Sequence, residues 1–299
     1  MYKKTKWLKG IAYEVAFWNN VYRWNHGFRA LMNWSNYGSV IDLELFDANQ
    51  FLIGIDHPQV LDVGCGMSYA TGNHVKREKI LEPLDIHYVD PLAWYFNDIL
   101  KRNNRNLPAI TFGMMEYLSS FYPNHNIDLV IIQNALDHSS NPVKGIVEAI
   151  NALRMGGILY LNHHPNEAET EHYKGFHQYN ITVKDEQLVI WNKKENIIIN
   201  DLLHDFASIE VRRNLETGHI IAIIKKTAEV PDELYNKSQD ITELCESLIH
   251  INRVSQNFSH SLSFKLHYGL FNTIQFFAQM LTYDQRMKIK KLIKQQSPA

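Results

Sequence analysis

The fold of this chain is decided by one short stretch, Val60-Leu61-Asp62-Val63-Gly64-Cys65-Gly66-Met67-Ser68. An apolar run leads into a Gly-x-Gly turn, which is the pattern of a buried strand that ends at a ligand site. Glycine lets the backbone turn sharply and lets a ligand approach closely, because no side chain stands in the way. We therefore interpret Gly64 and Gly66 as the centre of a binding turn.

A second apolar run, 86–89, ends at Asp90. An acidic side chain at the tip of the second strand can accept hydrogen bonds from both hydroxyls of a ribose, which indicates a nucleoside-containing ligand. The turn lacks the third glycine of the dinucleotide fingerprint, because Ala70 follows Tyr69. The segment between Asp62 and Asp90 is also longer than the roughly 20 residues usual in that fold. Both departures disfavour a nicotinamide dehydrogenase.

Strands and helices alternate around this turn. Continuous apolar strands that alternate with helices indicate an α/β fold, with a parallel sheet covered on both faces. We expect this domain to span 51–228, with an insertion at about 172–205 that contains a hairpin. The expected strands are 59–63, 86–89, 109–112, 127–132 and 157–161, the hairpin strands 188–191 and 197–199, and a closing antiparallel pair, 207–213 and 219–225; the expected helices include 91–102 and 142–154.

Helical regions flank the domain. In the N-terminal cap, residues 1–50, apolar residues recur at steps of three and four, as on one face of an amphipathic helix: Leu8, Ile11, Val15, Trp18 and Tyr22. Such a face packs on a core or covers a substrate pocket, and the two interpretations are compatible. Residues 229–299 also have a helical pattern, with an apolar stripe of Leu270, Ile274, Phe277 and Leu281. Their basic end, 286–294, is typical of a solvated face.

Four motifs, in order along 58–162, resemble those of class I S-adenosylmethionine (SAM)-dependent methyltransferases. They are Leu61-Asp62-Val63-Gly64-Cys65-Gly66; Tyr88-Val89-Asp90; Asp128-Leu129-Val130 followed by Asn134-Ala135-Leu136-Asp137-His138; and Leu153-Arg154-Met155-Gly156-Gly157-Ile158-Leu159-Tyr160-Leu161. The resemblance implies a Rossmann-like seven-stranded, mostly parallel sheet with an antiparallel closing hairpin. It also implies SAM above the carboxyl ends of the strands.

The same resemblance implies which residues hold SAM. It places Gly64 and Gly66 beside the methionine part of SAM and Asp62 near the same end, with Asp90 at the ribose hydroxyls. Met114 stands where the family often has an acid for the adenine amino group, so backbone groups and apolar packing would hold adenine. The expected cofactor-binding residues are Asp62, Gly64, Cys65, Gly66, Asp90, Pro91, Met114, Met115 and Asn134.

Methyl transfer to a hydroxyl needs an aligned acceptor and a base for its proton, and histidine is the natural base near neutral pH. His163 and His164 directly follow the fifth strand, where a parallel sheet presents its ligand-facing end. His177 lies in the insertion and His138 follows the fourth strand. Each of the four could instead be a structural or surface histidine, and the sequence leaves that choice open.

The segment 163–172 is rich in histidine and glutamate, yet its spacing matches no established ligand pattern. Cys65 and Cys245 are too few for a cysteine-built zinc site or a disulfide framework. We therefore expect no metal site.

Composition and charge limit the partners and the location. The formal net charge of the 299 residues is -2, so bulk charge does not favour nucleic acid. No apolar run is long enough to span a membrane, and no apolar core of a signal peptide follows the basic start. The expected location is therefore the cytoplasm.

The expected function is SAM-dependent methylation of a small-molecule or glycan acceptor, with S-adenosylhomocysteine (SAH) as product. The wider pattern, including Phe17-Trp18-Asn19-Asn20 and His177-Gln178-Tyr179-Asn180, resembles methyltransferases encoded with bacterial surface-glycan genes. That resemblance implies O-methylation of a sugar, an activated sugar or a sugar-linked phosphate in polysaccharide biosynthesis. The alternatives are an RNA or protein methyltransferase and a non-catalytic SAM-binding domain; the sequence does not determine the oligomeric state.

Overall fold

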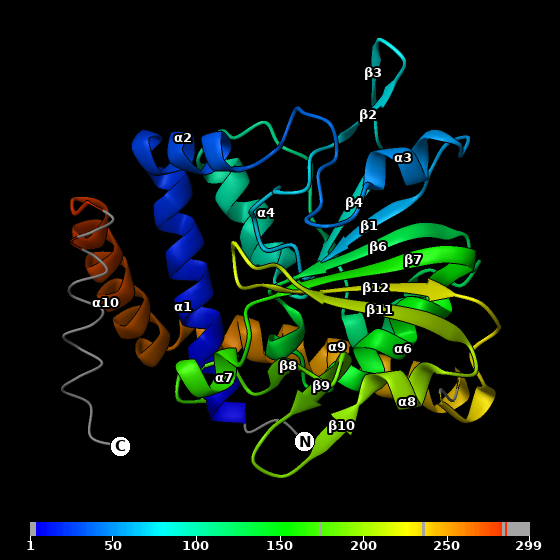
Figure 1. Cartoon of the computed structure of the whole chain (residues 1–299). Helices are drawn as coiled ribbons and strands as arrows, with labels where there is room; N and C mark the ends of the chain where they lie inside the picture. Colours follow the sequence, from blue (N-terminus) through cyan, green and yellow to red (C-terminus); the bar gives the residue numbers. More distant parts are fainter. Residues whose placement is uncertain (1–3, 174, 235–236, 283–284, 286–299) are drawn as a thin grey trace.

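A seven-stranded sheet forms the centre of the molecule in the computed structural model, which describes residues 4–173, 175–234, 237–282 and 285 (Figure 1). The strand order is β11-β12-β7-β6-β1-β4-β5, and β12 runs antiparallel to both of its neighbours. The α/β prediction with a closing antiparallel pair is confirmed. The strands are β1 (Val60–Val63), β4 (Ile86–Asp90), β5 (Thr111–Phe112), β6 (Ile127–Gln133), β7 (Leu153–His163), β11 (Ala207–Arg213) and β12 (Ile220–Lys226).

Each face of the sheet builds its own apolar core, because successive side chains of a strand point to opposite faces. Leu129 and Ile131 of β6 pack into one core, and Val130 and Ile132 pack into the other. The first core includes side chains of α1 (Lys4–Arg23), α3 (Ala48–Ile53) and α4 (Ala93–Arg102). The second includes side chains of α5 (Leu118–Phe121), α6 (Pro142–Ala152) and α8 (Ile199–Leu203). A sheet covered on both faces is what its continuous apolar strands predicted.

The N-terminal helix α1 buries Ile11, Val15 and Tyr22, in agreement with the predicted amphipathic face. The short helix α2 (Asn25–Trp34) follows it. Helix α10 (Leu262–Gln279) lies beside α1 (Figure 1), with the Tyr13 and Phe271 ring centroids 5.1 Å apart. The division of the chain at residues 50 and 228 stays a prediction.

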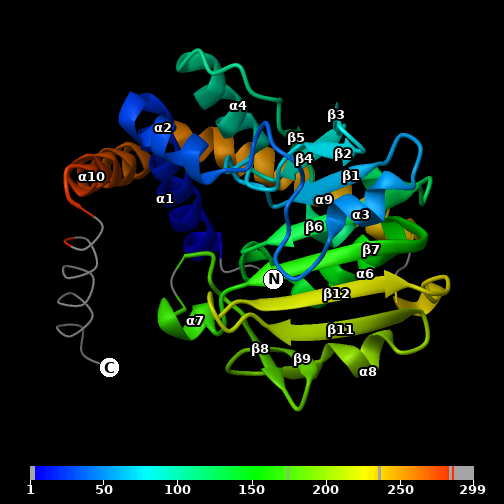
Figure 2. The ribbon, with the colours of Figure 1, turned by 45° about the horizontal axis from the view of Figure 1, so that its top comes forward.

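Two segments differ from the expected pattern. A hairpin of β2 (His74–Arg77) and β3 (Ile80–Pro83) projects from the sheet (Figure 1) where the sequence indicated only a long connection. The insertion forms three strands rather than two, β8 (Asn180–Lys184), β9 (Gln187–Trp191) and β10 (Asn196–Ile198) (Figure 1 and Figure 2). The remaining elements are η1 (Met115–Tyr117), η2 (Leu136–His138), α7 (Glu167–Thr170), η3 (Asp232–Leu234) and α9 (Lys237–His260).

The apolar stripe of α10 faces outward: Leu270, Ile274 and Phe277 are exposed. The predicted basic end, 286–294, lies outside the described residues. None of the helices in the described ranges is both long and apolar enough to cross a membrane.

Candidate active site

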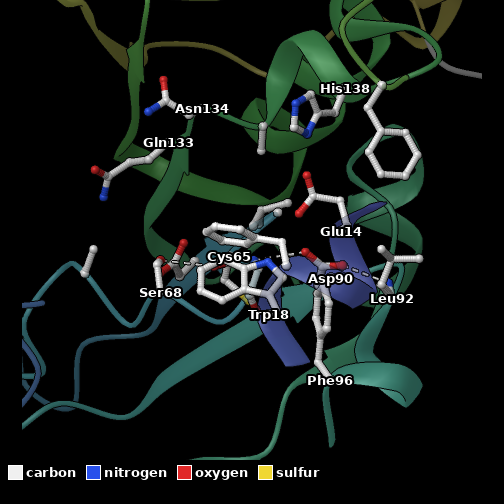
Figure 3. A pocket seen from close by; sticks show the side chains of 18 of the residues that line it. Glu14, Trp18, Cys65, Ser68, Asp90, Leu92, Phe96, Gln133, Asn134 and His138 are labelled. Atoms are coloured by element: carbon white, nitrogen blue, oxygen red, sulfur yellow. Dashed lines mark hydrogen bonds between the residues drawn. The ribbon is translucent and has the colours of Figure 1, made fainter. Parts of the chain in front are cut away.

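A cavity of about 980 Å³ opens at the carboxyl ends of β1, β4, β6 and β7. Its volume is near the upper end of the range for small-ligand sites, which leaves room for two ligands. Helix α1 forms one wall: Figure 3 shows Glu14 and Trp18 pointing into the space that the ends of the strands enclose. All nine residues expected to bind the cofactor line this cavity: Asp62, Gly64, Cys65, Gly66, Asp90, Pro91, Met114, Met115 and Asn134.

The glycine turn is held against the end of β4. The Gly64 N–H donates to the Val89 carbonyl at 2.8 Å, and the Gly66 N–H donates to Oδ2 of Asp90 at 3.0 Å. Gly64 has φ +67, and a Cβ built on it would lie 2.4 Å from the Cβ of Ala135. Both the backbone conformation and the close approach of the segment between β6 and η2 therefore require glycine at this position.

Asp90 links the glycine turn to the following helix and keeps acceptor sites for a ligand. Its Oδ1 accepts from the Leu92 N–H at 2.7 Å, so the carboxylate bridges the glycine turn and the start of the following helix. Each carboxylate oxygen carries a further acceptor site, which leaves Asp90 able to bind a hydroxyl in the cavity.

Asp62 and Asp90 are both buried. Burial raises the pKa of Asp90 to about 6, and burial together with the neighbouring Asp90 raises the pKa of Asp62 to about 7. Two close carboxyl groups of this kind favour a ligand that carries positive charge. SAM carries a sulfonium and an ammonium group, so its methionine end suits this part of the cavity.

Asn134 joins the ends of β6 and β7. It adopts a left-handed conformation with φ 47, which asparagine tolerates better than most residues. Its Oδ1 accepts from the His164 N–H at 3.0 Å, and its own N–H donates to the Asn162 carbonyl at 2.9 Å. Asn134 thereby fixes the loops that carry the candidate histidines.

The four candidate histidines occupy different places. His138, His164 and His177 line the cavity, whereas His163 is buried and does not line it. His163 points to the other face of β7, since neighbouring residues of a strand alternate. Burial lowers the pKa of His163 to about 4, so this imidazole is neutral near pH 7.

The side chains of His138 and His177 both contact Asp137, which the sequence analysis named only as part of a motif. The His177 Nδ1 lies 2.7 Å from Oδ2 of Asp137 and 3.2 Å from the His138 Nε2. Burial alone would raise the pKa of Asp137, but His138 and the hydrogen bond from His177 outweigh it and hold the pKa below its usual value. Burial would lower the pKa of His177, yet the hydrogen bond to Asp137 raises it overall. We call Asp137, His138 and His177 the histidine–aspartate cluster.

A second histidine pair lies elsewhere on the cavity wall. The rings of His164 and His219 are 4.4 Å apart, and Nδ1 of His219 lies 2.9 Å from Oε1 of Glu44. All three residues line the cavity. Sequence reasoning missed Glu44 and His219 because they lie outside every motif and approach His164 only through the packing of distant segments.

Glu14 is the other residue that sequence reasoning missed. Figure 3 shows it between His138 on one side and Asp90 on the other. Burial and the nearby Asp90 raise the pKa of Glu14 to about 7, although His177 lowers it somewhat. The sequence held one signal for it: Glu14 lies four residues before Trp18, so the two share one face of the helix. Both residues line the cavity.

A protein family described as a methyltransferase domain matches residues 61–161, about a third of the chain. These residues contain β4, β5 and β6 and most of β1 and β7, together with the glycine turn and Asp90. They form a class I SAM-dependent methyltransferase domain. SAM is therefore the methyl donor of this domain.

Solved structures of methyltransferases are similar to this chain at low identity. A 16S rRNA methyltransferase from T. thermophilus is 16% identical, with 63% of this chain and 41% of that chain covered and a TM-score of 0.34. A SAM-dependent methyltransferase from Methanosarcina mazei is 14% identical, with 62% and 100% covered and a TM-score of 0.36. One from Clostridium acetobutylicum is 11% identical, with 62% and 93% covered and a TM-score of 0.36.

This chain spans less than half the length of the first of these proteins. No curated protein is significantly similar to it in sequence. Likenesses this weak say nothing about the acceptor, which has to be inferred from the cavity itself.

Proposed function

We propose that the protein transfers the methyl group of SAM to a hydroxyl of a small acceptor without phosphate, such as a sugar. The transfer breaks the bond between sulfur and the methyl carbon, forms an O–CH3 bond, and releases the hydroxyl proton and SAH. The leaving group is already activated in SAM, so the protein has to align the acceptor, exclude water and favour loss of the proton.

The proposal rests on one observation: the donor-binding residues and a group of proton-transfer residues lie at two ends of the same cavity. The glycine turn and Asp90 form the donor end, and the histidine–aspartate cluster faces the same space. Imidazole and carboxylate groups in such contact promote loss of a proton from a hydroxyl near neutral pH. We assign this role to the cluster as a whole.

The charge of the lining favours an acceptor without phosphate. Seven carboxylic residues line the cavity, and none of its lining residues in the described parts of the chain is lysine or arginine: the acids are Glu14, Asp42, Glu44, Asp62, Asp90, Glu116 and Glu167. Proteins that bind phosphate groups or nucleic acid use lysine, arginine or backbone N–H groups to offset the negative charge. Of the expected acceptors, a sugar hydroxyl therefore fits better than a nucleotide sugar, a sugar phosphate or RNA.

Aromatic walls are the second feature that suits a sugar. Phe17, Trp18, Trp34 and Phe176 line the cavity, and aromatic faces pack well against sugar rings. The sequence resemblance to surface-glycan methyltransferases supports the same substrate class, with polysaccharide biosynthesis as its setting. A base-catalysed transfer also distinguishes this proposal from a non-catalytic SAM-binding domain.

The test is an acceptor screen with isotopically labelled SAM. The panel pairs free sugars and simple glycosides with their phosphorylated and nucleotide-linked forms, and includes RNA and a protein extract. We expect label on an oxygen of uncharged glycosides, located by mass spectrometry and nuclear magnetic resonance. Label only on phosphorylated forms, on RNA or protein, or on nitrogen would contradict the proposal.

A further inference from the structure

We propose that Asp137, His138 and His177 form a binding site for a divalent first-row transition metal ion in the wall of the cavity. One donor atom from each residue, Oδ2 of Asp137, Nε2 of His138 and Nδ1 of His177, lies within 4.8 Å of the other two. Two imidazole nitrogens and one carboxylate oxygen are a donor set that zinc, iron and cobalt accept.

The distances between the donor atoms suit a metal ion. They are 2.7 Å from Asp137 to His177, 3.2 Å from His138 to His177 and 3.6 Å from His138 to Asp137. Ligands about 2.0–2.1 Å from a tetrahedral ion lie about 3.3 Å from one another. An ion placed among the three atoms therefore needs only small shifts of the side chains.

The surrounding contacts hold the donors in place, as metal sites require of their supporting groups. The Gln178 N–H donates to the Asp137 carbonyl at 3.2 Å, so the loop that carries His177 is tied to η2. The Tyr179 hydroxyl donates to the Ser140 carbonyl at 3.2 Å on the same loop. The Phe176 and His138 rings pack with centroids 5.5 Å apart.

The electrostatics of the cluster also favour a cation. Oδ1 of Asp137 is buried and makes no hydrogen bond within the described residues, so the carboxylate is only half satisfied. Two imidazole nitrogens 3.2 Å apart can share at most one proton, which leaves a lone pair available to a metal. The carboxylates of the cavity wall add negative potential, and Glu167 is among them.

The sequence did not indicate this set, because 39 residues separate His138 from His177 and no fixed ligand spacing links them. The apparent candidate, the acidic segment 163–172, contributes none of the three donors. His138 and His177 both line the cavity, so the open coordination position faces the space beside the donor end. A metal there would hold the acceptor oxygen and ease loss of its proton, a role that rests on the proposed function.

Metal binding can be tested without an acceptor. The full-length protein, stripped with a chelator, is titrated with Co²⁺, followed by its visible absorption, and with Zn²⁺ in a calorimeter. We expect one ion per chain, with cobalt bands of low-coordinate nitrogen and oxygen ligation. Failure of the acceptor screen would leave this result unchanged, so the two proposals are tested separately.

The deciding variant is His138→Ala, because it removes one donor and leaves the hydrogen bond between Asp137 and His177. We expect it to weaken Co²⁺ binding by more than about tenfold, the lower bound for losing even a supporting group of a metal site. His177→Ala should do the same. His219→Ala, which removes another histidine of the cavity wall, is the matched control and should bind Co²⁺ as the wild type does.

Binding of SAH by each variant reports that it is folded. The metal site is ruled out if the wild type binds no stoichiometric Co²⁺. It is equally ruled out if folded His138→Ala binds the ion as tightly as the wild type, which is the result expected of a plain Asp137–His177 proton-transfer pair, or if His219→Ala loses it equally.

Discussion

The imidazole Nδ1 of His177 lies 2.7 Å from Oδ2 of Asp137, although 40 residues separate the two in the chain. This contact brings the loop before β8 to the end of β6, so the insertion between β7 and β11 supplies part of the cavity. The donor end is built from the ordered motifs, with Trp18 of α1 over the glycine turn, and the acceptor end from the insertion and other residues of α1. Each end can be tested by itself.

Removal of the His177 imidazole should slow the chemical step more than it weakens donor binding. We expect His177→Ala to lower kcat by about 10²–10⁴, the usual contribution of a group that moves a proton, while the Kd for SAH stays unchanged. The measurement is steady-state kinetics with the acceptor found by the screen. The control is His204→Ala, an exposed histidine that does not line the cavity. Equal kcat values for His177→Ala and wild type would remove the cluster from the mechanism.

Gly64 should tolerate no side chain. Its φ is +67, and a Cβ would lie 2.4 Å from the Cβ of Ala135, so Gly64→Ala should lower the free energy of unfolding by at least about 1–3 kcal/mol. The rise in Tm on adding SAH should also disappear. Gly269→Ala is the matched control, because a Cβ at this helical glycine meets none of the described residues within 4 Å. The interpretation of the turn is wrong if Gly64→Ala keeps the full SAH-induced rise.

Asp62 should couple pH to both stability and donor binding. Its pKa, about 7 in the folded protein, lies above the value of about 3.9 expected in the unfolded chain. Its contribution to stability is therefore present at low pH and is lost as pH rises through about 7. At pH 8, Asp62→Asn without ligand should be more stable than the wild type, by up to a few kcal/mol at roughly 1.4 kcal/mol per pKa unit.

Donor binding should show the opposite trend. The cationic groups of SAM favour ionised carboxylates, so the affinity of the wild type for SAM should rise between pH 6 and pH 8. In Asp62→Asn this rise should be smaller and the affinity at pH 8 lower. Calorimetry at the two pH values, with thermal unfolding of the same samples, checks both trends. A less stable Asp62→Asn protein at pH 8, or a pH-independent SAM affinity in the wild type, would contradict this role of Asp62.

Trp18 should bind the donor through its apolar surface. A Cβ on Gly66 would lie 3.0 Å from the Trp18 ring, so the ring covers the turn closely. We expect Trp18→Ala to weaken SAH binding by about tenfold or more, since burial of a large apolar side chain contributes about 1.5–3 kcal/mol. Trp94→Ala, at an exposed tryptophan outside the cavity, should bind SAH normally. Identical SAH affinities for the two variants would show that α1 is no part of the donor site.

The sequence predicted which residues gather at the donor end of the cavity because each of them lies in a local motif. Gly64, Gly66 and Asp90 each lie where one apolar strand ends, and parallel strands bring such ends to one edge of the sheet. All expected cofactor-binding residues do line the cavity, although their contacts with SAM stay predictions. The mostly parallel character of the sheet followed from the same alternation of strands and helices.

The acceptor end could not be predicted in the same way. Glu14, Glu44 and His219 reach the cavity through packing of segments that no motif connects. His163 was expected to face the cavity because it lies just after the predicted strand. In the structure β7 extends by two residues at that end and includes His163, which does not line the cavity. A pattern with a period of two cannot place a side chain on a face when the end of the strand is uncertain.

Titration of the wild type and of Asp90→Ala with SAH, followed by calorimetry, tests most directly that the glycine turn and Asp90 hold the methyl donor. We expect one SAH per chain for the wild type. For Asp90→Ala we expect an affinity lower by roughly 10- to 150-fold, as hydrogen bonds to a charged group contribute about 1.5–3 kcal/mol. No binding to the wild type at millimolar SAH, or equal affinities for the two proteins, would contradict the account.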